Sequence, residues 1–250
     1  MTDPNAEHRS PVHDVIALIR NRRSVRDFTG RPVPKALVDV IVECGLAAPS
    51  SKNSNPWFIV TATGADKDQI ASWFREAISE PDGQSERVPV DPLTGSARAG
   101  LRDTVAESVQ TLERCDTVLL LFNRAPFSRG ADTLLAAMQN PETRSSAGKA
   151  LYGYAGEIIG IGAAAENMLL AARALGLGAV YMADSYPARQ RIMRGLQTSR
   201  ELVGAIAIGY GAYDPTPRVL RREFAASWQD AVGRIDLSVS EQESFWVKNE

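Results

Sequence analysis

The spacing of apolar residues predicts two helices near the start of the chain. Residues from Pro11 to about Arg22 carry an apolar stripe at helical spacing, with Ser10 as the N-cap. A second helix begins at Pro34, and Gly45 is expected to end it. The predicted buried positions of the two helices are Val12, Val15, Ile16, Ile19, Leu37, Val40, Ile41 and Cys44.

The rest of the pattern mixes short apolar runs with longer helical stripes, which predicts one α+β domain over residues 11–250. Strands are expected at 57–63, 117–123, 179–183 and 202–209, and helices at 66–78, 101–112, 156–175 and 188–196. Three segments lack such a pattern. They are a polar N-terminal tail (1–10), an exposed excursion rich in proline, glycine and charge (80–100), and an irregular stretch (125–154) with a short helix near 133–138.

Composition narrows the function. The 250 residues have a net charge of −2, which gives no general electrostatic reason to bind nucleic acid or an anionic membrane. No apolar stretch has the length of a signal peptide core or a membrane span, and the two cysteines, Cys44 and Cys115, lack metal-ligand spacing. We therefore expect a cytoplasmic protein without a metal site.

The two histidines, His8 and His13, lie in the leading tail and the first helical turn. Ser-His and Cys-His catalysis need an imidazole beside the nucleophile, and common metal enzymes need several imidazole or thiolate ligands. The sequence therefore favours an organic cofactor as the source of any chemistry.

Two segments carry candidate chemistry. The first is Arg22-Arg23-Ser24-Val25-Arg26, whose guanidinium and hydroxyl groups suit phosphate oxygens. Taken alone, a basic helix end that complements the helix dipole explains it better. The second is the loop from Pro49 to Pro56, whose amide side chains offer donors and acceptors. Ordinary turn chemistry explains that loop equally well in isolation.

Together the two segments resemble the nitroreductase family of FMN-dependent enzymes. In that family an Arg-Arg/His-Ser-x-Arg/Lys segment follows the first helix, and a Pro-Ser-Ser-x-Asn-x-Gln-Pro-Trp loop leads into a strand. This chain departs from the loop pattern at Asn55, which keeps the amide of the family's glutamine on a shorter arm. The helix at 163–176 resembles the family's dimer-core helix, and Ile208-Gly209-Tyr210 resembles its last core strand.

The resemblance implies a mostly antiparallel central sheet surrounded by helices, and a homodimer with FMN at the subunit interface. Arg22, Ser24 and a C-terminal arginine would hold the FMN phosphate, and Arg26 would lie near the flavin N1–C2 carbonyl. The loop would contact FMN across the subunit boundary, and residues 182–184 would turn backbone N–H groups toward flavin N5, with Asp184 where the family often has glycine or glutamate. The implied cofactor-binding residues are Arg22, Arg23, Ser24, Arg26, Pro49, Ser50, Ser51, Asn53, Asn55, Met182, Ala183, Asp184, Arg221 and Arg222.

The resemblance also implies roles for two further segments. Arg221 and Arg222 match the family's basic segment after the last strand, although a solvated basic turn explains them as well. The stretch 125–154 suits an active-site lid, with Phe127 and Tyr152 as substrate or nicotinamide contacts, and the aromatic-bearing tail at 224–250 would pack on the partner subunit. Four basic residues near the lid either favour NADPH through its extra phosphate or are simply solvated: Arg124, Arg129, Arg144 and Lys149.

The implied function is reduction of nitroaromatic, quinone or related small electron-poor substrates by NAD(P)H, in a ping-pong mechanism without a required acid–base side chain. Reductive dehalogenation and oxygen-dependent FMN breakdown are rival reactions in the same family. Ser24 counts against FMN breakdown, because that type usually has Arg-Arg-Asp. A flavin-binding sensor without turnover is the rival of a different class.

A dinucleotide-binding fingerprint is the remaining alternative. The run from Gly160 to Ala165 matches G-x-G-x-x-A, but that motif requires a strand ending at the first glycine. Here the apolar stripe runs through the glycines at helical spacing, so small residues at a helix–helix contact explain them better.

Overall fold

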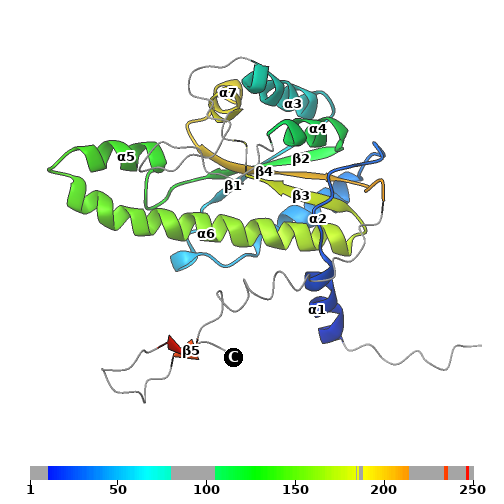
Figure 1. The fold of residues 1–250 in the computed structure, drawn as a ribbon, viewed down its shortest axis with the longest axis horizontal. Coiled ribbons are helices and arrows are strands. Elements are labelled where there is room, and N and C mark those ends of the chain that lie inside the picture. The colour runs from blue at the N-terminus through cyan, green and yellow to red at the C-terminus, as the bar shows by residue number, and fades with distance from the viewer. Residues whose placement is uncertain are drawn as a thin grey trace, which may run out of the picture. The chain divides into compact units, whose positions relative to one another are not determined.

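Four strands form one antiparallel sheet with the order β1-β2-β4-β3 (Figure 1). The computed structural model describes residues 11–79, 105–183, 185, 188–213, 234–235 and 246–247. The predicted α+β class is confirmed, and each predicted strand lies within one or two residues of its observed position. The strands are β1 (Trp57–Thr63), β2 (Thr117–Asn123), β3 (Gly178–Met182) and β4 (Glu201–Gly209).

Helices cover both faces of the sheet, which explains why all seven residues of β2 are buried. Alternate side chains of a strand point to opposite faces. Val118, Leu120 and Phe122 accordingly pack into the core beneath one group of helices, and Leu119 and Leu121 into the core on the other face. The first group is α3 (Gly64–Ser79), α4 (Val105–Arg114) and α7 (Arg189–Gly195); the second is α2 (Lys35–Leu46) and α6 (Arg144–Ala174), as Figure 1 shows.

The central helix α6 is longer than the predicted 156–175. It spans 31 residues from Arg144 to Ala174, and its first turns pair with α5 (Ala131–Gln139) in a helical hairpin that projects beyond the sheet (Figure 1). The prediction of an irregular stretch up to residue 154 was wrong because Gly148 and Gly153 lower helix propensity, and packing against α5 overrides it. Gly153 packs on the turn before α5, where a Cβ would lie 3.0 Å from the Cβ of Phe127.

The glycines of the dinucleotide-like run lie inside α6, as the helical stripe predicted. Gly160 is buried, and a Cβ there would lie 3.2 Å from Pro56 Cγ. Helix α6 is also long and apolar enough to cross a membrane by length and composition, but 44% of its most apolar window is buried in this fold. It is the core helix on one face of the sheet.

Helix α2 differs from its prediction at two positions. Gly45 does not end the helix, which continues to Leu46; a Cβ at Gly45 would lie 2.7 Å from Met168 Cγ, so this glycine permits close packing on α6. Val40 is 41% exposed, and Val38 takes its place in the core.

Helix α1 (Pro11–Asn21) has the predicted stripe, but the stripe is not buried within the described chain. Val15, Ile16 and Ile19 are 56%, 44% and 53% exposed. A row of exposed aliphatic side chains on one helix face marks a surface that another protein chain can cover.

A second compact unit comprises residues 216–250, in which a short antiparallel pair is described, β5 (Arg234–Ile235) with β6 (Trp246–Val247). Several predictions lie outside the described residues: the tail 1–10, the excursion 80–100, the tail 224–250 apart from that pair, Asp184, Arg221 and Arg222.

Candidate cofactor and substrate site

The segment after α1 follows the edge of the sheet, and this position brings Arg22 and Ser24 to one pocket. Ser24 forms an isolated parallel bridge with Ala179 of β3, and the N–H of Val25 donates to the carbonyl of Ala179 (3.0 Å). The pocket has a volume of about 360 Å³. Its lining residues are Arg22, Ser24, Ile158, Gly162, Ala165, Glu166, Leu169, Tyr181 and Val203.

Arg22 is oriented in this pocket by a carboxylate that the sequence did not indicate. Its Nε donates to Oε1 of Glu166 on α6 at 3.0 Å. A guanidinium has five N–H donors in a fixed fork, so this bond leaves the Nη groups for a second anion. The two neighbouring arginines differ. Arg23 donates through Nη1 to the carbonyls of Arg20 and Arg22 (2.9 and 2.7 Å), and Arg26 is exposed.

The serine–asparagine loop is a short 3-10 turn, η1 (Ser51–Asn53), with unusual backbone angles. Lys52, Asn53 and Asn55 have φ of 52°, 53° and 45°, in the left-handed region that non-glycine residues occupy at a cost of about 1–3 kcal/mol each. The hydroxyl of Ser50 accepts from the N–H of Asn55 (3.0 Å) and fixes the turn. Such strain concentrates at functional sites.

The loop packs on the glycines of α6. A Cβ at Gly160 would lie 3.4 Å from Cβ of Ser50, and one at Gly156 would lie 3.4 Å from Cβ of Ser51. The small residues therefore let the loop backbone approach the helix. Asn53 is exposed, so its amide can reach a ligand, whereas Asn55 is half-buried and its Oδ1 accepts from the hydroxyl of Ser50 (3.5 Å).

The two predicted substrate residues lie in different surroundings. Phe127 is 44% exposed, and Nζ of Lys52 lies 5.6 Å from its ring centroid, which places the ring beside the serine–asparagine loop. Tyr152 is 84% exposed on α6. At the other end of the predicted site, Met182 is buried at the end of β3 and Ala183 is exposed.

A fully buried carboxylate lies below Phe127. Glu157 of α6 accepts hydrogen bonds from the N–H groups of Phe127 and Ser128, from Nδ2 of Asn123 and from the hydroxyl of Ser128. Burial raises the pKa of this carboxyl, but the hydrogen bonds outweigh it and hold the pKa below its ordinary value. The sequence signal was a single carboxylate in phase with the buried stripe of α6.

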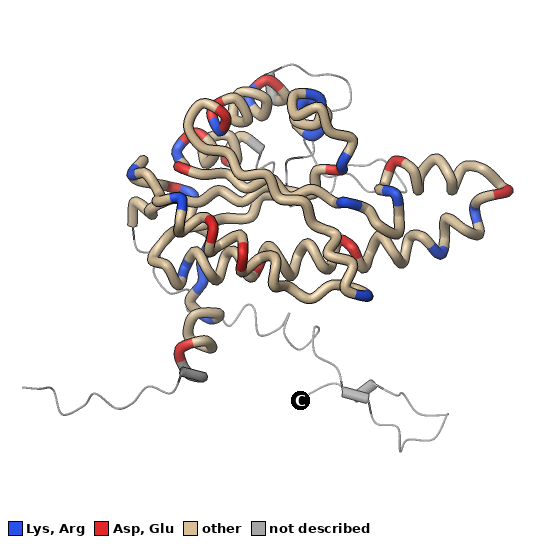
Figure 2. Tube along the Cα trace, turned by 180° about the vertical axis from the view of Figure 1, so that it is seen from behind, with Lys and Arg blue, Asp and Glu red and all other residues tan. Residues whose placement is uncertain are grey.

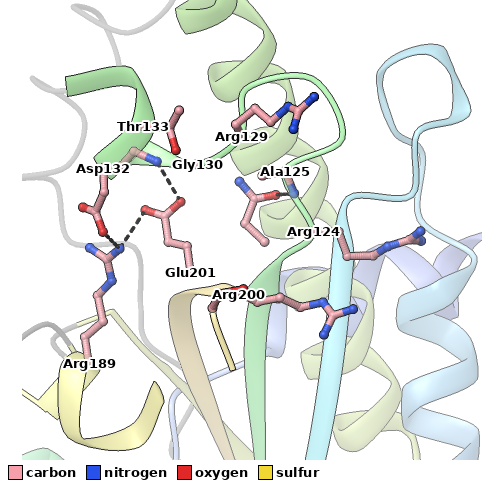
Figure 3. A pocket seen from close by; sticks show the side chains of 12 residues that line it. Arg124, Ala125, Arg129, Gly130, Asp132, Thr133, Arg189, Arg200 and Glu201 are labelled. Carbon is pink, nitrogen blue, oxygen red and sulfur yellow. Dashed lines mark hydrogen bonds and ion pairs between the residues drawn. The ribbon is translucent and has the colours of Figure 1, made fainter. Parts of the chain in front are cut away.

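A second pocket, of about 270 Å³, lies at the same end of the sheet, where Asn123 pairs with Glu201 (Figure 3). Arg189 binds Asp132 (3.2 Å) and approaches Glu201 (3.9 Å), and Glu201 also accepts from the N–H of Ala131 and the hydroxyl of Tyr154. Burial and that hydrogen bond raise the pKa of Tyr154 to about 12.

Of the four basic residues considered for NADPH, Arg124 and Arg129 line this second pocket. In Figure 3, Arg124 and Arg200 extend to the side away from Arg189 and its carboxylate partners. Arg200 stacks on Phe58 (4.3 Å from the guanidinium carbon to the ring centroid), and Arg124 donates to the carbonyl of Asn55 (3.4 Å). Basic and acidic positions are interspersed along the described elements (Figure 2).

Nucleophilic chemistry has little support among the described residues. Burial raises the pKa of the Cys115 thiol to about 12, so it is not a thiolate near neutral pH. The described residues contain no group of three or more His, Cys, Asp or Glu that could hold a metal ion.

Comparison with known proteins identifies the fold. The model of the nitroreductase family matches residues 19–210, which include both sequence segments and all four strands of the sheet. The chain belongs to the nitroreductase family. With the family, the class of enzyme is also established, an oxidoreductase of the nitroreductase type.

Relatives agree with this assignment. The chain is 28% identical over 213 residues to an NADH dehydrogenase of Thermus thermophilus (83% of this chain, 91% of the relative), and 26% identical over 220 residues to nitroreductase NfnB of Mycolicibacterium smegmatis (81% and 84%). Two solved structures share the fold. They are the FMN-dependent nitroreductase NfnB from Mycobacterium smegmatis with NADPH (TM-score 0.58, 20% identity, 80% and 89% covered) and a nitroreductase-type protein from Desulfovibrio desulfuricans with FMN (TM-score 0.55, 22% identity, 90% and 96% covered).

Proposed function

We propose that this family member binds FMN and uses NAD(P)H to reduce nitroaromatic, quinone or related small electron-poor substrates in a ping-pong cycle. The observation that carries the proposal is the pocket in which Arg22 and Ser24 meet, with Arg22 held by Glu166. Relatives named as nitroreductases and 4-nitrobenzoate reductase support the substrate class.

The donor set of this pocket fits the phosphate end of FMN. A guanidinium whose hydrogen bond to Glu166 uses Nε and leaves the Nη groups, together with a serine hydroxyl, gives charge-assisted and neutral donors to phosphate oxygens. Gly162 contributes no side chain, and a Cβ there would meet nothing within 4 Å, so the pocket is open on that side. FMN held there would supply the redox chemistry between NAD(P)H and the acceptor.

The remaining residues bind, orient and shield. Arg26 would place a fixed positive charge at the flavin N1–C2 edge, where negative charge develops on reduction. Pro49, Ser50, Ser51, Asn53 and Asn55 would contact the cofactor bound by a partner subunit. Arg23, Met182, Ala183, Asp184, Arg221 and Arg222 complete the proposed cofactor set, and Phe127 and Tyr152 would contact the acceptor or the nicotinamide.

A homodimer in the cytoplasm is the proposed state. The exposed stripe of α1 and the 73% exposed Ile159 of α6 are apolar surface that a second copy would remove from water. The tail at 224–250 would pack on the partner, and the hairpin within 125–154 would cover the flavin. Arg124 and Arg129 lead us to propose a preference for NADPH over NADH.

The visible spectrum of the purified protein tests the cofactor. We expect flavin bands, either on purification or after FMN is added, and a protein that never acquires FMN would refute the proposal. Anaerobic mixing with NADPH then separates a reductase, which bleaches the flavin within seconds, from a flavin-binding sensor, which stays yellow. Nitrobenzene or a quinone should reoxidise the reduced protein and leave FMN intact, and a halogenated phenol should not release halide. Release of halide from that phenol, or breakdown of FMN in the presence of oxygen, is what the rival reactions of the family predict.

A further inference from the structure

Glu157 is a charged group in the core, and within the described residues its four hydrogen bonds come from Asn123 at the end of β2 and from the Phe127–Ser128 turn that follows. The residue is 0% exposed. Oε1 accepts from the N–H groups of Phe127 (2.7 Å) and Ser128 (3.0 Å), and Oε2 accepts from Nδ2 of Asn123 (3.0 Å) and the hydroxyl of Ser128 (2.5 Å). A carboxylate has about four lone-pair sites, so these donors saturate it. Removal of a partner would leave buried charge or buried donors unsatisfied, which is costly.

The turn that Glu157 holds has a strained backbone. Ala125, Arg129 and Gly130 have φ of 50°, 65° and 87°. Asn123 Oδ1 accepts from the N–H of Ala125 (2.8 Å), and Ser128 Oγ accepts from the N–H of Gly130 (3.0 Å). Positive φ at non-glycine residues persists where the surroundings over-determine the conformation. Here the surroundings are the network centred on Glu157.

Phe127 is the residue that this turn presents. Its backbone N–H is bonded to Glu157, and its Cβ lies against Gly153 of α6, where even a methyl group would approach to 3.0 Å. Its ring is 44% exposed, with Nζ of Lys52 at 5.6 Å. The base of the side chain is therefore fixed, while the ring remains available at the serine–asparagine loop.

We propose that Glu157 is a positioning residue for the acceptor site: through the N–H of Phe127 it fixes the ring against which an aromatic substrate packs, and so sets the preference for aromatic acceptors. The inference rests on the proposed function, because it requires that Phe127 contacts the acceptor. A network that serves stability alone would have the same hydrogen bonds but no effect on which acceptor is reduced.

The matched variants exchange an amide for a carboxylate. Glu157→Gln keeps the shape but turns N–H groups toward groups that are themselves donors. Adding Asn123→Asp restores complementarity, because the carboxylate introduced on β2 accepts from the new amide on α6 and still accepts from the N–H of Ala125. The double variant N123D/E157Q has the same net charge and the same number of amides as the wild type. Ser128→Ala is a milder variant that removes the hydroxyl's hydrogen bonds with Glu157 and with the N–H of Gly130, and leaves three donors on Glu157.

Two measurements separate positioning from stability. One is the Kd of nitrobenzene for the oxidised, FMN-loaded protein by calorimetry, without turnover. The other is kcat/KM for nitrobenzene relative to ferricyanide, an inorganic acceptor that needs no aromatic contact. Stacked aromatic pairs contribute about 0.5–1.5 kcal/mol, so loss of the ring position should raise the Kd of nitrobenzene and lower its kcat/KM relative to ferricyanide, each by about two- to twelvefold. We expect this in E157Q, a smaller loss in S128A, recovery in N123D/E157Q, and ferricyanide reduction within about twofold throughout.

Phe127→Ala completes a double-mutant cycle with Glu157→Gln. It should reproduce the nitrobenzene loss, and E157Q should add nothing in the F127A background, because Glu157 acts through Phe127. A lower Tm of E157Q or S128A with an unchanged nitrobenzene-to-ferricyanide ratio would overturn the inference and leave the proposed function intact. An F127A variant that keeps FMN and binds nitrobenzene normally would overturn both the assignment of Phe127 and this inference. Failure to acquire FMN at all would overturn the proposed function itself.

Discussion

The Arg22–Glu166 pair makes a quantitative prediction about cofactor choice. If Arg22 holds the phosphate of FMN, Arg22→Ala should weaken binding of FMN but not of riboflavin, which has the same ring system and no phosphate. The ratio of the two dissociation constants isolates the phosphate contact, because losses of stability or of ring contacts affect both ligands.

The magnitude follows from the geometry of the pair. Glu166 occupies Nε of Arg22 at 3.0 Å, so the phosphate is left with the Nη edge. One hydrogen bond to a charged group contributes about 1.5–3 kcal/mol, and the 27% exposure of the Arg22 side chain favours the lower half of that range. Since about 1.4 kcal/mol is tenfold in affinity, Arg22→Ala should raise the Kd of FMN roughly ten- to fortyfold. Glu166 would lose its partner at little cost, because its side chain is 46% exposed and stays hydrated.

The assay is fluorescence titration of flavin-free protein with FMN and, in parallel, with riboflavin. Arg20→Ala is the matched control, since Arg20 is an exposed arginine in the last turn of α1, two positions before Arg22, and lies outside the pocket. We expect the control to change the FMN-to-riboflavin ratio by less than about twofold at moderate salt. Equal weakening of both ligands by Arg22→Ala, or no weakening of either, would refute the phosphate assignment.

Three further predictions use the same protein. Arg26→Ala should slow flavin reduction by NADPH in stopped flow more than it weakens FMN retention. The opposite order would refute the proposed position of Arg26 near the flavin N1–C2 carbonyl. Glu166→Gln keeps an oxygen acceptor for Arg22 and removes a negative charge beside the phosphate, so FMN should bind about twofold more tightly; weaker binding would mean that the charge itself is needed to align Arg22. Tyr154 has its pKa raised from 10.0 to about 12, so its contribution to stability is complete below pH 10 and is lost as the pH rises through about 12. In Tyr154→Phe, the unfolding free energy from denaturant titrations should therefore fall less steeply with pH over that window. The same pH dependence in variant and wild type would contradict the assignment.

The strands could be predicted because a buried strand is a short run of mostly apolar residues. β2 is apolar at nearly every position, since both of its faces are covered, and the observed bounds match the prediction. The first turns of α6 could not be predicted, because Gly148 and Gly153 argue locally against a helix. The contacts that override them come from α5 and Phe127. Gly45 misled for the same reason: its function is a close approach to Met168, 123 positions further along the chain.

The residues of the candidate site also fall into two groups, those that a local motif selects and those that only the fold brings together. Arg22, Ser24 and the serine–asparagine loop are contiguous motifs, so residue type and order sufficed to select them. Glu166 meets Arg22 across 144 positions, and no local pattern connects the two. The fold brings Arg22 and Glu166 together, because the segment that contains Arg22 and Ser24 is bonded to β3, and β3 packs on α6.

Glu157 is the intermediate case, because the sequence predicts its burial and its need for hydrogen-bond donors but not which residues supply them. It lies four positions before Ile161 and eleven before Met168, in phase with the stripe that faces the sheet. A carboxylate at such a position is buried, and a buried carboxylate requires donors. Three of the four donors to Glu157 come from the Phe127–Ser128 turn and the fourth from Asn123 at the end of β2, so the demand is met by the chain that enters the α5–α6 hairpin. A charge in the apolar stripe therefore predicts a fixed turn beside the helix, and it takes the fold to show that the turn carries Phe127.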